Sequence, residues 1–331
     1  MAQVNTVLGP VAAASLGQTL MHEHIFVLSP EIEKWPTGEG LESSEEWDEE
    51  RRMAQAIEKL RDLRDHGIGT LVDLTVIGLG RDTKRILRVA RAVPEINVVV
   101  ATGLYTYNEL PFYFRFRGPG TLLGGPERMT EMWVRDIEKG IGNTGVKPGL
   151  LKCATDLEGL TPGVERVLRT VAQAHRRTGI PITTHTPIPP EPWGLEQQRI
   201  FREEGVDLTQ VVIGHTGGTS DLDYAQQLMD NGSFIGMDRF GMTTFSFEET
   251  VGFVAGLCKR GYAGQMVLSH DAQCYGDWFD PSMLESLPDW RWTHISEDVL
   301  PALRKAGVSE EQILQMMVEN PAKCLTPCDP Y

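Results

Sequence analysis

Short runs of apolar and β-branched residues alternate along the chain with longer stretches whose apolar residues lie three and four positions apart. Most of the short runs are continuously apolar rather than alternating. This pattern is typical of strands that are buried on both faces of a parallel sheet. The predicted strands are 19–27, 69–75, 96–102, 149–155, 180–186, 210–216, 233–238 and 265–271.

The stretches between these runs predict amphipathic helices, since their apolar residues share one face and charged residues lie between them. Thr161-Pro162 and Gly179 are a helix start and stop. Residues 309–312, with the sequence SEEQ, offer a capping box in the C-terminal part. The predicted helices are 47–66, 82–93, 127–140, 162–178, 195–205, 221–231 and 247–260, followed by two more within 297–321.

Eight strands, each followed by a helix and with no break in composition, predict one (β/α)8 TIM barrel that forms a single domain over residues 1–331. A doubly wound open sheet is the alternative, and it would need a topological switch point. The longest irregular stretches, 28–46, 103–125 and 272–295, each follow a predicted strand. A barrel builds its active site there, at the C-terminal ends of its strands.

Length and charge narrow the possible partners. The 331 residues suit one large barrel or two ordinary domains. With 46 acidic and 31 basic residues, the formal charge of −15 argues against nucleic acid or an anionic membrane as a partner. The N-terminus lacks the pattern of a signal peptide, and no apolar run is long enough to span a bilayer. Five cysteines without a C-x-x-C pair indicate a reduced, cytoplasmic protein.

Two histidines lie inside the first predicted strand. His22 and His24 are two residues apart, so their side chains point to the same face of the strand. One interpretation is a pair of hydrogen-bonded polar core residues, since each buried imidazole needs a partner. The other interpretation is a pair of ligands to a divalent metal, a role that suits neutral imidazoles.

Four further polar residues stand at or near the ends of later predicted strands: Lys152, His185, His215 and Asp271. A lysine inside the apolar run LLKCA is unusual, because a buried ammonium group is strongly disfavoured unless it is paired. One interpretation pairs Lys152 with an internal carboxylate such as Asp73 or Asp156. In the other, Lys152 has a lowered pKa and reacts with carbon dioxide to give a carbamate, which can bridge two cations.

Together the six candidates would place four imidazoles, one carboxylate and one potential carbamate at the same end of the barrel. Such a set of ligands is suited to a site with two metal ions. A two-metal site generates hydroxide near neutral pH and polarises a carbonyl or phosphoryl oxygen. The sequence therefore favours a metal-dependent hydrolase.

This set of residues resembles the metal-ligand pattern of the amidohydrolase superfamily and, within that superfamily, the pattern of the phosphotriesterase family. The similarity extends over nearly the whole chain, through TLMHEH at 19–24, IGHTGGTSD at 213–221 and SHD at 269–271. It is closest to the phosphotriesterase-like lactonases. The segments that carry this closer similarity are TGLY at 102–105, LPFYF at 110–114, GMDRFG at 236–241 and DW at 277–278.

The resemblance implies a barrel with a binuclear centre of zinc, cobalt, iron or manganese, in a protein that forms homodimers. The residues that match the ligands of the more buried metal are His22, His24 and Asp271. The residues that match the ligands of the more exposed metal are His185 and His215. Carboxylated Lys152 and a hydroxide would bridge the two metals. The implied substrates are small molecules, namely lactones such as N-acyl-homoserine lactones and, more weakly, organophosphate triesters such as paraoxon.

The implied reaction is attack of the bridging hydroxide on the lactone carbonyl, with Asp271 accepting the proton and passing it on as the ring opens. Tyr105 would orient the lactone or stabilise the oxyanion, while Arg239 and Trp278 would line the entrance and the acyl pocket. The chain departs from its relatives at AQCYG, 272–276, so its acyl-chain preference stays open. An aryldialkylphosphatase or another esterase or amidase of the superfamily, and a non-catalytic metal-binding scaffold, are the alternatives.

Overall fold

The computed structural model describes residues 2–29, 47–242, 244–279 and 281–331, and a ring of parallel strands forms its centre. Neighbours in the sheet follow the order of the chain, and each of these pairs is parallel. The strands of this sheet are β3 (Gln18–Val27), β4 (Ile68–Asp73), β5 (Asn97–Gly103), β6 (Leu150–Ala154), β7 (Ile182–His185), β8 (Val211–Ile213), β9 (Phe234–Met237), β10 (Met266–Leu268) and β11 (Gln273–Gly276).

Both ends of the sheet belong to one segment, 266–276, and this segment closes the ring. β10 pairs with β9, whereas β11 pairs with β3 on the other side. Between them, the amide of Asp271 donates to the carbonyl of His22 at 3.0 Å, and the amide of His24 donates to the carbonyl of Ala272 at 2.9 Å. The predicted barrel is confirmed. The doubly wound alternative is wrong, because the sequential order of the strands leaves no switch point.

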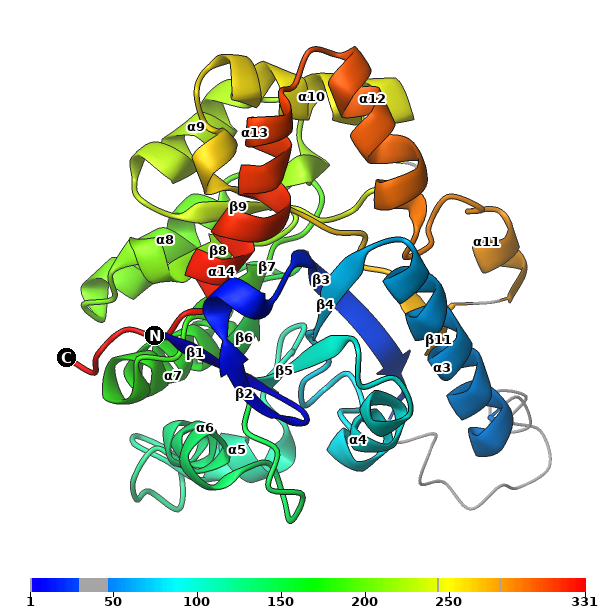
Figure 1. The fold of residues 1–331 in the computed structure, drawn as a ribbon. Helices are drawn as coiled ribbons and strands as arrows, with labels where there is room; N and C mark the ends of the chain where they lie inside the picture. The colour runs from blue at the N-terminus through cyan, green and yellow to red at the C-terminus, as the bar shows by residue number, and fades with distance from the viewer. Residues whose placement is uncertain (1, 30–46, 243, 280) are drawn as a thin grey trace.

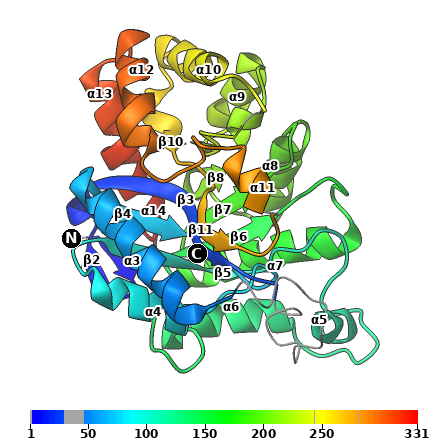
Figure 2. The same cartoon turned by 90° about the vertical axis from the view of Figure 1, so that its right-hand side faces the viewer.

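Helices surround the strands on the outside, as Figures 1 and 2 show. They include α3 (Glu49–Asp65), α4 (Thr83–Ala92), α6 (Arg128–Lys139), α7 (Pro162–Thr178), α8 (Trp193–Glu203), α9 (Leu222–Asp230) and α10 (Phe247–Lys259). The predicted helices match these closely, and Thr161 caps α7 through the amide of Val164, as expected. None of the helices that the described residues form is long and apolar enough to cross a membrane.

The C-terminal part forms two continuous helical stretches, as predicted. A π-helical turn, Ile295–Val299, leads into α12 (Leu300–Lys305). The second stretch runs from α13 (Glu310–Leu314) through another π-helical turn, Gln315–Glu319, into α14 (Asn320–Leu325). The capping box predicted at its start is present, because Ser309 and Gln312 each accept from the other's backbone amide.

Several short elements were not predicted. An antiparallel hairpin of β1 (Gln3–Thr6) and β2 (Gly9–Ala12) precedes the barrel. The long loops carry α5 (Phe112–Phe116) and α11 (Pro281–Glu285), and α11 lies on the side of the barrel toward which β3 points (Figure 1). Most of the predicted loop 28–46 lies outside the described residues.

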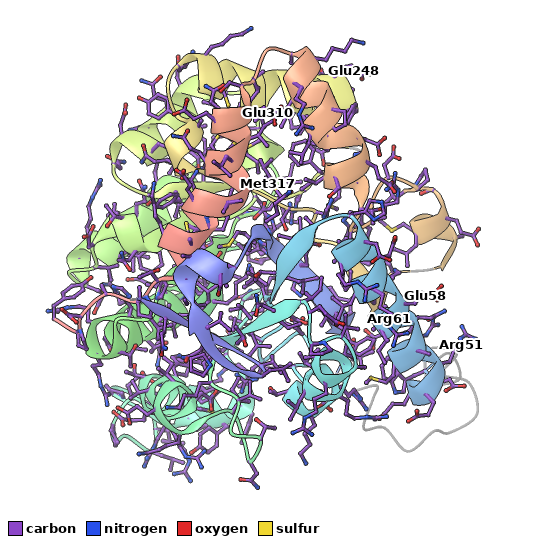
Figure 3. All side chains as sticks on the ribbon, in the orientation of Figure 1. Arg51, Glu58, Arg61, Glu248, Glu310 and Met317 are labelled. Carbon is purple, nitrogen blue, oxygen red and sulfur yellow. The ribbon has the colours of Figure 1, made fainter. Side chains whose placement is uncertain are left out.

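Two apolar clusters explain why the ring is filled at one end and open at the other. The smaller cluster lies inside the barrel, where strands contribute inward side chains such as Val72, Val99 and Leu150, and Val4 of the hairpin packs against them. The larger cluster lies between the strands and the helices. Charged side chains occupy the outer helix faces, as Arg51, Glu58 and Arg61 of α3 illustrate (Figure 3). Since apolar side chains fill the N-terminal end, polar chemistry is confined to the C-terminal ends of the strands.

Gly103, the last residue of β5, allows that strand to lie close to β6. It adopts a φ of +143°, and a Cβ atom there would stand 1.9 Å from the carbonyl oxygen of Lys152. We expect Gly103→Ala to lower the free energy of unfolding by about 2–4 kcal/mol, because both the backbone conformation and the backbone contact reject a side chain. Urea denaturation measures this. Gly252→Ala, at an exposed and uncrowded position of α10, is the control and should be neutral or stabilising.

Candidate metal centre

The structure brings all six predicted metal-ligand candidates together at the C-terminal end of the barrel. His22 and His24 lie in β3 and both border the cavity inside the barrel, so they share a face as their spacing predicted. Lys152 lies in β6 and His185 ends β7. The other two lie past the ends of β8 and β10, which are shorter than predicted. These two, His215 and Asp271, are the described non-glycine residues with positive φ, 59° and 56°.

The side-chain atoms of this cluster approach one another closely. The Nε2 atoms of His22 and His24 lie 3.4 and 3.2 Å from Oδ1 of Asp271. On the other side, Nε2 of His215 lies 2.9 Å from Nδ1 of His185 and 3.6 Å from Oδ2 of Asp271. Asp271 therefore stands between a pair of histidines from one strand and a pair from two others.

The opposite nitrogens of these rings are held by acceptors, and this sets their tautomers. Asp238 accepts from Nδ1 of His22 at 2.8 Å and from Nδ1 of His215 at 2.9 Å. Nδ1 of His24 lies 2.8 Å from the hydroxyl of Thr75. Nε2 of the fourth ring, His185, lies 3.2 Å from Oδ2 of Asp156. With a proton on each outer nitrogen, the inner nitrogens carry lone pairs that face one another.

This donor set fits divalent cations. Facing lone pairs and a carboxylate repel one another unless positive charge lies among them, and imidazole with carboxylate is a common ligand set for zinc, cobalt, iron and manganese. Burial lowers the pKa of His22, lowers the pKa of His185 to about 4 and holds the pKa of His215 well below its usual value. These three rings therefore favour the neutral form that metal ligands need.

Asp238 is the residue that sequence reasoning missed. It follows β9 directly, is fully enclosed, and also accepts from the backbone amide of His215 at 2.8 Å. Its position in the segment GMDRFG, at the end of a predicted strand, was the available signal. The strand pattern alone did not show that one carboxylate would reach two histidines from different strands.

Lys152 lies in the floor of the cluster with its side chain buried. Its Nζ is 3.1 Å from Nε2 of His22 and donates to the carbonyl of Thr184 at 3.1 Å. In the part of the chain that the structure describes, it forms an ion pair with neither Asp73 nor Asp156, so these two suggested partners are wrong; the carboxylates whose charges act on it are those of Asp271 and Asp238. Asp73 instead accepts from backbone amides, and Asp156 contacts a ring at the rim. Burial lowers the pKa of Lys152 to about 8, which favours the neutral amine that carbamate formation requires.

The three residues predicted to contact substrate all border the same cavity. The hydroxyl of Tyr105 donates to Asp156, and burial together with this carboxylate raises its pKa above the usual range. Arg239 lies deeper than expected, with Nε 3.4 Å from Oδ2 of Asp271. Trp278 is 47% exposed at the mouth, and its ring centroid lies 6.2 Å from that of Tyr105.

The cavity has a volume of about 360 Å³ and opens above the cluster. Five of the six candidate ligands border it, while His215 lies just behind them, completely enclosed. The upper wall is mainly apolar. Its side chains include Val27, Leu79, Ile188, Met242, Phe279 and Trp290. A polar floor beneath an apolar wall suits a small molecule with one reactive polar group and an apolar substituent.

Comparisons with known proteins show the family to which this fold belongs. The model of the phosphotriesterase family matches residues 2–325. A solved structure described as the phosphotriesterase from Mycobacterium tuberculosis is 53% identical, covers 99% of this chain and 100% of its own, and superposes with a TM-score of 0.94. An aryldialkylphosphatase of Saccharolobus solfataricus is 37% identical over 95% of this chain and 96% of its own length.

A second solved structure bears on substrate choice. It is 32% identical, covers 98% of this chain and 100% of its own, and has a TM-score of 0.87. Its description concerns organophosphate hydrolysis activity engineered from a weak promiscuous lactonase template. That protein thus connects the two reactions on one barrel.

Proposed function

Since the chain belongs to the phosphotriesterase family and is a hydrolase of that family, we propose that it is a binuclear metal-dependent lactonase with secondary phosphotriesterase activity. The observation that carries the proposal is the convergence of six candidate ligands at the floor of one partly apolar cavity. The substrates would be lactones such as N-acyl-homoserine lactones. The same resemblance leads us to propose a homodimer, which sedimentation velocity would test.

In this proposal each side chain has a defined task. One cation would be held by His22, His24 and Asp271, and the other by His185 and His215. Lys152, carboxylated on Nζ, would bridge them. When bound, the two cations would lower the pKa of water and polarise the carbonyl or phosphoryl oxygen of the substrate.

The remaining steps are proton transfer and orientation. Asp271 faces the cavity and is placed to accept a proton from the attacking water and return it to the departing alkoxide. Arg239, beside its Oδ2, favours the ionised carboxylate that this role needs. The hydroxyl of Tyr105 donates to Asp156. It would orient the lactone through its ring, or stabilise the oxyanion by turning this proton from Asp156 toward the substrate.

A comparison of kcat/KM values tests the substrate class. If the lactonase activity is the main one, kcat/KM for acyl-homoserine lactones should exceed kcat/KM for paraoxon by about tenfold or more. The ratio of the two values is the right measure, because specificity is set by differential stabilisation of the two transition states. A pH-stat assay of ring opening and the release of nitrophenol measure the two rates. The opposite ranking would favour the second candidate, an aryldialkylphosphatase, which the relative of that name supports. Full metal content with no turnover of either substrate would favour the scaffold alternative.

Metal removal should abolish both activities. Dialysis against a chelator is expected to remove turnover and to lower the melting temperature, because an ion that binds only the folded chain stabilises it by mass action. Zinc, cobalt, manganese or ferrous iron should restore turnover and the melting temperature, and elemental analysis should find two ions per chain. Calcium is the control and should restore neither, since it prefers oxygen ligands. Full activity in metal-free protein would contradict the assignment.

A further inference from the structure

Asp271 holds a backbone conformation that needs support. Its φ of 56° is left-handed, a region that ordinary residues enter at a cost of roughly 1–2 kcal/mol. It lies in the break between β10 and β11, where the chain leaves the regular sheet. Its own amide is tied to the carbonyl of His22. That single bond does not fix the residues on either side, which set where the carboxylate points.

Glu23 supplies contacts on both sides of this break. Because His22 and His24 point into the barrel, the residue between them points outward, and it is completely buried there. Its Oε1 accepts from the hydroxyl of Ser269 at 2.7 Å and from Nδ1 and the amide of His270 at 2.6 and 2.9 Å. Its Oε2 accepts from the amide of Ala272 at 3.0 Å. All four donors lie within the three residues that flank Asp271.

His270 extends the same network to the end of the long loop that follows it. With Nδ1 donating to Glu23, its Nε2 is free to accept, and it receives the amide of Ile295 at 3.0 Å. Its carbonyl accepts from Nε1 of Trp290 at 2.8 Å. Trp290 borders the active-site cavity. His270 therefore joins the break at Asp271 to the π-helical turn Ile295–Val299 through its imidazole, and to the cavity wall through its carbonyl.

We propose that Glu23 and His270 are positioning residues, which hold Asp271 in the left-handed conformation that aims its carboxylate at the metal centre. The proposal rests on the function proposed above, since it assumes that Asp271 binds metal. Packing alone does not account for the pair. A buried carboxylate without a facing cation is expensive to desolvate, and an apolar side chain would fill the space at lower cost. All four donors to this carboxylate lie in one short segment, which indicates that its role is to fix the conformation of that segment.

Two substitutions of His270 separate its two contacts. Asparagine reproduces the Nδ1 donor toward Glu23, whereas glutamine reproduces the Nε2 acceptor toward Ile295. We expect His270→Gln to weaken binding of cobalt, added alone to the metal-free chain, by about 10–100-fold, as is common for partners of metal ligands. His270→Asn should stay near the wild-type affinity. At saturating cobalt, kcat of the glutamine variant should fall while KM changes little.

Glu23→Gln tests the other member of the pair of positioning residues Glu23 and His270, which we call the clamp. Its new amide would face the amide of Ala272 or Nδ1 of His270, so we expect a similar loss of cobalt affinity and a changed φ at Asp271 in a crystal structure. Asp136→Asn is the matched control. Asp136 is also buried, and it accepts from Arg81 and Thr102, away from the cluster. The Asp136→Asn variant should therefore have a lower melting temperature but unchanged cobalt affinity.

Each outcome decides one question. Equal cobalt affinity and equal kcat in His270→Gln, His270→Asn and the wild type would overturn the clamp, even if Glu23→Gln does not fold. Loss of affinity in the asparagine variant with retention in the glutamine variant would also overturn it, because the contact to Glu23 would then not matter. A wild-type chain that binds no cobalt would instead overturn the proposed function.

Discussion

Lys152→Ala should reduce kcat/KM for lactones by about 10³-fold, because losing a bridge between two cations removes several kcal/mol of transition-state stabilisation. Lys152 lies in the floor of the cluster, with its Nζ 3.1 Å from Nε2 of His22. Alanine would leave a space in which acetate or propionate can place a carboxylate where the carbamate stood. We therefore expect millimolar carboxylate to restore part of the activity.

The matched variant is Lys152→Met, whose side chain has similar length and fills the same space. It should be equally inactive, and added carboxylate should not restore it, because no void remains. Carbon-13 NMR after exchange with labelled bicarbonate should show a carbamate signal in the wild type and in neither variant. Unchanged activity in Lys152→Ala, or equal rescue of both variants, would refute the carbamate assignment.

The fold was predictable because the relevant signal is local. Continuous apolar runs such as those of β4 and β5 reflect burial on both faces, which is typical of the parallel sheets of α/β proteins. Residue spacing likewise predicted that His22 and His24 share a face. The N-terminal hairpin was missed because its burial depends on packing against the barrel floor, through Val4, rather than on its own pattern.

The metal-ligand candidates were predictable as a set, but their geometry was not. Periodicity does not show where a strand stops, so His215 and Asp271 were expected inside strands although both lie in left-handed turns beyond them. For Lys152 the sequence offered Asp73 and Asp156 as partners, since both lie near strand ends. Which of several strand-end groups meet depends on the closure of the ring. That closure also brings Asp238 between two histidines, a long-range contact with no local signature.

Asp238→Asn is the second substitution from which we expect a large effect. The carboxylate of Asp238 accepts one hydrogen bond from Nδ1 of His22 and one from Nδ1 of His215, one ring on each side of the proposed centre. Asparagine has one acceptor oxygen and one amino group. Its amino group would face one of the two Nδ1 atoms, and that ring would have to move its proton to Nε2. An imidazole protonated on Nε2 has no lone pair to offer toward the cluster.

The variant should therefore lose one ligand, and with it about 10–100-fold in metal affinity for one of two ions. In a cobalt titration followed by elemental analysis, the variant should bind one ion tightly and the second more weakly, whereas the wild type should bind both tightly. At subsaturating cobalt, kcat of the variant should fall. Asp221→Asn is the control. Asp221 caps α9 from outside the cluster, and asparagine caps a helix about as well, so neither stability nor cobalt binding should change. If Asp238→Asn instead binds two ions with wild-type affinity, the tautomers of the two rings are not set by this carboxylate, and the pairing seen here is packing alone.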